Sequence, residues 1–117
     1  MTSKEIADLA AWTANSIQTT LKFDGRKLDD AGADIIREYV QTDLTNWDRG
    51  NKVTVETSTR LAQEIMARRR HETQTENEVF ISLSILSSKF HEFVEDQLRQ
   101  RAAEAKRLAA TMPAIKV

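Results

Sequence analysis

Residues 76–110 read ENEVFISLSILSSKFHEFVEDQLRQRAAEAKRLAA, and no glycine or proline interrupts them before Pro113. Their apolar residues recur in alternating steps of four and three, the spacing of one helix face. This seam consists of Val79, Leu83, Leu86, Phe90 and Phe93, with Gln97 at the next step. Thr75 and Glu78 can form a capping box at its start. At 1.5 Å per residue the helix would span about 50 Å, more than the ~30 Å of a typical domain. We therefore expect part of it, within residues 98–117, to protrude.

Ile81 and Ile85 point away from this seam. A helix that is apolar on both sides is normally surrounded on both, either by helices of its own chain or by a second copy. Beyond residue 98 the apolar stripe thins to Ala102, Ala105, Leu108, Ala109 and Met112, and its three alanines allow close approach but bury little area. These two isoleucines and three alanines form the predicted interface. A symmetric homodimer with antiparallel helices is the form we favour.

Three shorter helices are predicted before residue 76, because capping and turn residues mark their ends. The first runs from Thr2 to Asp24-Gly25, the second starts near Asp29 or Asp30, and the third runs from Thr54 or Thr57 to Arg70. The 117 residues include 3 glycines and 1 proline, and 40% are apolar. This mixture is too apolar for disorder and too poor in turn formers for a many-stranded sheet. The prediction is one all-α domain of residues 1–117, a small four-helix bundle with a long C-terminal helix.

The second helix contains a carboxylate, Asp43, within its apolar stripe. Either this side chain faces the core and must be paired, or the helix stops near Gln41 and Asp43 caps a short turn towards Trp47. We favour the second interpretation. Under the first, Arg69, on the buried stripe of the third helix, is the candidate partner.

The composition excludes several kinds of chemistry. Cysteine is absent, which excludes disulfides, thiol nucleophiles and thiolate metal sites. His91 and Glu95 resemble half of a zinc-binding helix, but the spacing supplies no third ligand. The glycines are scattered, so no phosphate-binding loop can form. We therefore expect a protein without enzymatic activity, metal, cofactor or small-molecule substrate. The first residues contain no apolar segment, and we expect no membrane association and a cytoplasmic location.

The strongest concentration of charge is Arg68, Arg69 and Arg70, with Arg60 and Lys52 before it. Such a cluster can bind phosphates, although basic residues also simply favour the last turn of a helix. Residues 52–57 alternate as a short strand would, and a strand, a helix to Arg70 and a helix from residue 75 resemble the order of ribbon-helix-helix repressors. That resemblance implies paired strands in the DNA major groove. Glu56, on the outward side of the strand, departs from that role because it would repel phosphate.

The net charge is −1, so the whole molecule has no field that attracts nucleic acid. The interpretation we favour is a protein–protein interaction module, acting as an adaptor, inhibitor or regulatory subunit through helix packing and self-association. A nucleic-acid-binding regulator that uses the basic end of the third helix is the alternative.

Overall fold

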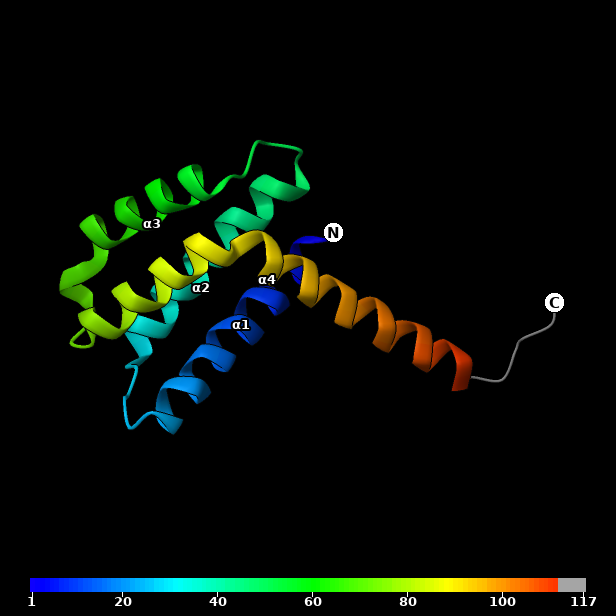
Figure 1. The fold of residues 1–117 in the computed structure, drawn as a ribbon, viewed down its shortest axis with the longest axis horizontal. Helices are drawn as coiled ribbons and strands as arrows, with labels where there is room; N and C mark the ends of the chain where they lie inside the picture. The colour runs from blue at the N-terminus through cyan, green and yellow to red at the C-terminus, as the bar shows by residue number, and fades with distance from the viewer. Residues whose placement is uncertain (112–117) are drawn as a thin grey trace.

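The computed structural model describes residues 1–111, and four α-helices make up most of them (Figure 1). They are α1 (Ser3–Phe23), α2 (Asp30–Asp48), α3 (Val55–Arg69) and α4 (Glu76–Thr111), with a 3-10 turn, η1 (Arg70–Glu72), between α3 and α4. Of the described residues, 85% are helical. The predicted all-α fold of four helices, with the longest one last, is confirmed. The predicted stop at Pro113 lies outside the described residues.

Side-chain caps start the first three helices. Thr2, Asp29 and Thr54 each accept a hydrogen bond from the backbone N–H three residues later. The turns after α1 and α2 each contain a glycine with positive φ, 74° at Gly25 and 78° at Gly50. These values suit glycine because it has no Cβ. Capping and turn residues thus place these helix ends close to where the sequence predicts them.

Helix α2 packs against each of the other three helices, as α4 also does. The inner face of α2 consists of fully buried side chains, Ile35, Ile36, Tyr39, Val40 and Leu44. At Gly32 the backbone of α2 comes so near α4 that a Cβ there would lie 2.8 Å from Cγ2 of Val79. Of the five apolar residues of the predicted seam, Val79, Leu83, Leu86 and Phe90 are buried, whereas Phe93 is half-buried.

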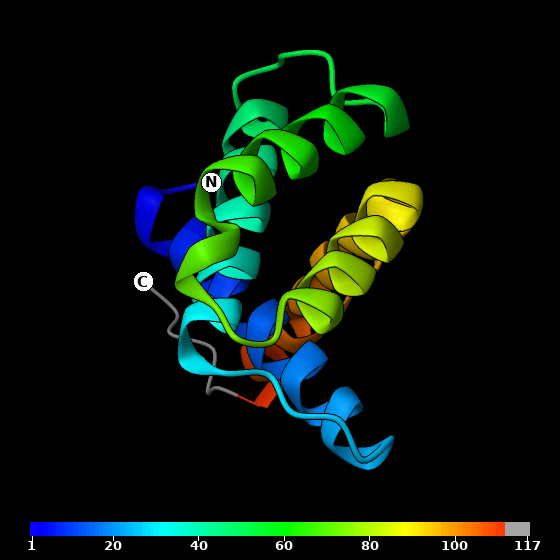
Figure 2. The ribbon, with the colours of Figure 1, turned by 90° about the vertical axis from the view of Figure 1, so that its left-hand side faces the viewer.

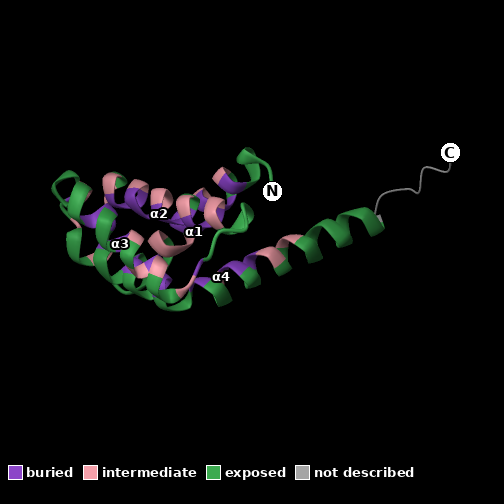
Figure 3. Cartoon of the chain, turned by 90° about the horizontal axis from the view of Figure 1, so that it is seen from above, coloured by how far each residue is buried: buried purple, intermediate pink, exposed green. Residues whose placement is uncertain are grey.

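Helix α4 leaves the globule halfway along its length. Its first half lies beside α3, and the second half passes the start of α1 and continues alone (Figures 1 and 2). The molecule is 57 Å long as a result. We call residues 98–111 the tail, and residues 102–110 of it are exposed (Figure 3). No helix within residues 1–111 is long and apolar enough to cross a membrane.

The ribbon of α4 changes direction in its yellow stretch in Figure 1. Two adjacent hydroxyls lie there. Ser87 donates a hydrogen bond to the carbonyl of Leu83 at 2.8 Å, and Ser88 donates one to the carbonyl of Ser84 at 3.0 Å. Hydroxyls that bond the carbonyl four residues earlier often bend a helix. This serine pair therefore explains where α4 turns away from the bundle.

The predicted stop of the second helix near Gln41 is wrong. Helix α2 continues to Asp48, and Asp43 is 2% exposed inside the bundle. The pairing of Asp43 with Arg69 is also wrong, because Arg69 binds other carboxylates. Leu44, which is fully buried, shows the physical reason: a helix that ended before it would leave this side chain in water.

The segment of residues 52–57 is no strand. Helix α3 already begins at Val55, and none of the described residues forms a strand, so the order of a ribbon-helix-helix protein is not formed. Val53 instead lies 9% exposed at the edge of the core, whereas Val55 is 47% exposed. The capping pair Thr54 and Thr57 bonds in both directions, which fixes the start of a helix there.

Candidate interaction surface on helix α4

Three large apolar side chains in the first half of α4 are exposed, in addition to Leu108 in the tail. Phe80 is 57% exposed, Ile85 is 55% exposed and Ile81 is 38% exposed. We call these three residues the apolar face. Since α1, α2 and α3 leave them open, the alternative in which another described helix of the same chain covers Ile81 and Ile85 is not realised.

The three alanines of the predicted interface, Ala102, Ala105 and Ala109, are exposed on the tail. They have no bulk beyond Cβ, so a second helix could approach the tail backbone closely. The apolar face and the alanines occupy the same helix but different halves of it. The first half is held by the bundle, and the second stands outside it.

A residue that the sequence did not single out, Trp12, lies at the base of the tail. Its side chain on α1 is 45% exposed and borders an open groove of about 370 Å³. The opposite wall comes from α4, with Gln97, Arg101 and Ala105 among its residues. The available signal was that Trp12 falls outside the buried stripe of α1.

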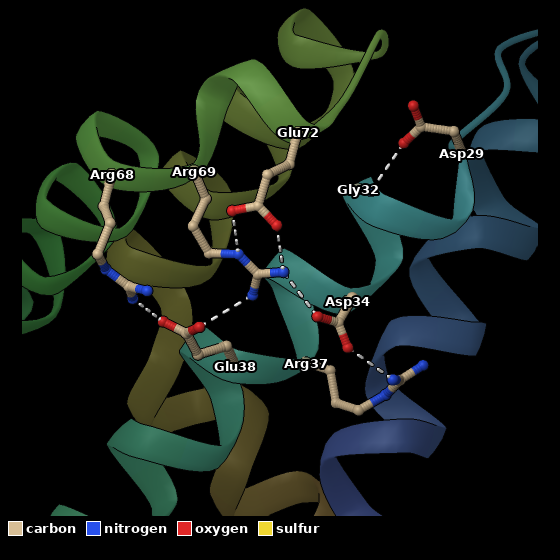
Figure 4. Close-up of polar contacts among 8 residues, drawn as sticks. All are labelled: Asp29, Gly32, Asp34, Arg37, Glu38, Arg68, Arg69 and Glu72. Atoms are coloured by element: carbon tan, nitrogen blue, oxygen red, sulfur yellow. Dashed lines mark hydrogen bonds and ion pairs between the residues drawn. The ribbon is translucent and has the colours of Figure 1, made fainter.

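The basic end of α3 is neutralised by carboxylates (Figure 4). The Arg69 guanidinium, whose side chain is 12% exposed, donates to Asp34 at 2.7 Å, to Glu38 at 2.9 Å and twice to Glu72 at 3.0 Å. Arg68 pairs with Glu38 as well. These two arginines and three carboxylates together carry a net charge of −1.

The pKa values agree with this arrangement. The hydrogen bonds with Glu72 and Asp34 raise the pKa of Arg69, although its burial opposes this. The same hydrogen bond from Arg69 lowers the pKa of Glu72. Each charge therefore stabilises the other. The spacing of Asp34 and Glu38, one helical turn apart, could have suggested a binding site for a cation, but the sequence does not show which one.

The other predicted phosphate-binding residues lie at the surface. Arg70 is 3.8 Å from Glu76, and Arg60 is 3.7 Å from Glu56. Lys52 is exposed in the loop before α3. All four arginines of the predicted nucleic-acid site thus face a carboxylate, which weakens the positive potential that phosphate binding needs.

A polar cluster lies inside the bundle around Asp43. The Tyr39 hydroxyl donates to Ser87 at 3.3 Å, whereas Oδ2 of Asp43 and Oγ of Ser58 are buried without a partner in hydrogen-bonding geometry. Burial raises the pKa of Asp43, and the hydroxyls of Ser58 and Tyr39 together with the charge of His91 offset part of this effect. Burial also raises the pKa of Tyr39. The cluster is closed to substrate, because Tyr39 and Ser58 are fully buried and Asp43 nearly so.

His91 and Glu95 are both exposed on α4. No group of three or more histidine, aspartate or glutamate side chains within residues 1–111 is arranged to hold a metal ion. No protein-family model, curated protein or solved structure matches the chain.

Proposed function

We propose that this protein is a non-enzymatic interaction module, an adaptor, inhibitor or regulatory subunit, which binds other proteins through helix α4 and associates with itself there. The observation that carries the proposal is the apolar face, Phe80, Ile81 and Ile85, which is left uncovered by the other helices. Monomeric proteins in water tend not to leave a contiguous apolar patch exposed, and such patches mark binding surfaces.

The neighbours of the apolar face suit a helical partner. Ser84 lies between Ile81 and Ile85 in the sequence and Ser88 follows them, and both serines are exposed on α4. The Ser88 hydroxyl already donates a hydrogen bond to the backbone carbonyl of Ser84, so a partner need not satisfy that donor. Large apolar side chains beside small ones form the ridges and grooves that packed helices need.

A regulator that binds nucleic acid through the basic end of α3 ranks second. Its support is the sequence Arg68-Arg69-Arg70, and the ion pairs of these residues with Glu38, Asp34, Glu72 and Glu76 count against it.

Sedimentation equilibrium tests the first proposal. We expect the wild type to associate and the variant Ile81→Asp with Ile85→Asp to be a folded monomer, because two charges would be buried in the interface. Phe23→Asp is the matched control, since Phe23 is 89% exposed at the far end of α1. This control should keep the mass of the wild type. A monomeric wild type, or a double variant that associates as the wild type does, would refute self-association through this face.

A further inference from the structure

The near-zero net charge hides a separation of charge along the chain. The tail carries Arg99, Arg101, Lys106 and Arg107 against Glu104, a net charge of +3. Residues 1–97 carry 12 basic and 17 acidic side chains, a net charge of −5. The basic segment is also the part of α4 that stands outside the bundle (Figures 1 and 3). A partner for the tail should therefore be acidic.

An acidic surface of this kind lies on α4 itself. A shallow groove of about 480 Å³ runs along the helix from Ile85 to Arg99. Its apolar part consists of Ile85, Leu86 and Phe93, and three carboxylates border it, together with one lysine and one arginine. The carboxylates belong to Glu92, Glu95 and Asp96. We call this feature the acidic groove, and it shares Ile85 with the apolar face.

We propose that the tail of a second copy lies in the acidic groove, so that two α4 helices pair in antiparallel orientation with each tail on the partner's groove. This rests on the self-association proposed above and names the segments that bind. Ala103 and Ala110 follow Asp96 in steps of seven residues, so they lie on the groove side of α4 and permit close approach there. The basic residues of the tail then meet Glu92 and Glu95, whereas Asp96 already pairs with Arg99 of its own chain at 3.7 Å.

The lengths of the two segments agree. The groove covers residues 85–99 and the tail residues 98–111, which at 1.5 Å per residue gives about 20 Å for each. If two antiparallel α4 helices cross near residues 98–99, the tail of each copy lies along the groove of the other copy. The pairing is necessarily between molecules, because groove and tail lie along one helix, overlapping only at residues 98–99, and cannot fold onto each other.

Anionic lipid is a less suitable partner for the tail. Interfacial helices bury several tryptophan, phenylalanine or leucine side chains in the membrane, whereas the exposed tail offers one of these, Leu108, among alanines. Alanine contributes little transfer free energy but suits the narrow space between two helices.

Charge reversal and mixing test the proposal on the full chain. One variant reverses the groove, Glu92→Lys with Glu95→Lys, and the other reverses the tail, Lys106→Glu with Arg107→Glu. All four side chains are exposed, so both variants should fold. We expect each variant alone to associate at least about tenfold more weakly than the wild type, by sedimentation equilibrium. An equimolar mixture should recover the wild-type affinity. In the mixed dimer the basic groove of one variant meets the acidic tail of the other, and the unchanged basic tail meets the unchanged acidic groove.

Lys22→Glu with Lys27→Glu is the matched control. It changes the net charge as much as the tail variant does, at exposed positions outside the groove and the tail, and should leave association unchanged. Circular dichroism of each variant checks the fold. Recovery in the mixture would be hard to obtain from any arrangement other than tail on groove.

The outcomes separate the two proposals. Association that persists in both charge variants, or a mixture no stronger than its components, overturns the groove assignment and leaves the apolar face as the interface. A wild type that stays monomeric and binds vesicles of anionic lipid overturns both self-association and the groove assignment. Loss of association on charge reversal but not in Ile81→Asp alone supports the groove and removes the apolar face, because Ile81 lies outside the groove.

Discussion

Asp29 connects two helix N-termini that are distant in sequence. Its Oδ1 accepts hydrogen bonds from the Gly32 N–H at 2.7 Å, the Thr73 hydroxyl at 2.6 Å and the Thr75 hydroxyl at 3.0 Å. Its Oδ2 accepts from the Gln74 N–H at 2.8 Å. Thr75, expected to act in a capping box with Glu78, instead directs its hydroxyl to Asp29. One carboxylate therefore caps α2 and fixes the loop that leads into α4.

Replacing Asp29 should destabilise the fold in a pH-dependent way. Desolvation raises its pKa, but the hydrogen bonds from Thr73, Gln74, Gly32 and Thr75 outweigh it and lower the pKa to about 2. The folded pKa is thus below the unfolded one, and the stabilisation is present above about pH 4 and lost as the pH falls towards 2. We expect Asp29→Ala to lower the free energy of unfolding by about 2–4 kcal/mol at pH 7. Urea titrations should show this difference shrinking below pH 4.

The opposite sign applies to Asp43. Because burial raises its pKa above the unfolded value, the stabilisation is present below about pH 4 and is lost as the pH rises through the folded pKa. At pH 7 the buried carboxylate then opposes folding. Asp43→Asn keeps the shape without the charge, and we expect it to raise the free energy of unfolding at pH 7 by about 1–2 kcal/mol. Equal stabilisation at pH 4 and pH 7 would contradict this account.

At the scale of elements, the contact of α2 with α4 depends on Gly32. Alanine is ordinarily the better helix former by about 1 kcal/mol. Here its methyl group would lie 2.8 Å from Val79 and 2.9 Å from Leu28, so we expect Gly32→Ala to lower the free energy of unfolding by about 1–3 kcal/mol. In a double-mutant cycle with Val79→Ala, which removes the nearest methyl groups, the losses should be less than additive. Additive losses would show that the helices do not meet there.

What the sequence predicts well is local. Thr2, Asp29 and Gly25 mark helix ends through bonds or angles within three residues, and the seam of α4 repeats over many turns. The failures involve distant contacts. Asp43 lies in a continuous helix because its surroundings come from three helices, and two of the three carboxylates that bind Arg69 are 31 and 35 residues away. No pattern in the sequence states that Ile81 and Ile85 stay uncovered, since that depends on where α1 and α2 pack.

At the scale of the whole molecule, the distribution of ion pairs determines what the surface attracts. We expect no binding to duplex DNA or RNA tighter than about 10⁻⁶ M at physiological salt, the range of non-specific contact. Fluorescence anisotropy with a labelled duplex measures this, and Arg68→Glu with Arg70→Glu should change it little. Sub-micromolar binding that falls steeply with added salt and disappears in this variant would favour the regulator that binds nucleic acid.

Because only its first half is held by the bundle, α4 should show very different rates of amide hydrogen exchange in its two halves. Around Leu83 and Phe90 the backbone can open only when the bundle does, so exchange there should report global unfolding. The tail has few tertiary contacts, and helical segments of its length are marginal in water, so its amides should exchange by fraying from the end. Mass spectrometry after brief labelling should resolve this gradient. A partner seated on the tail would then appear as slowed exchange over residues 98–111, even before its identity is known.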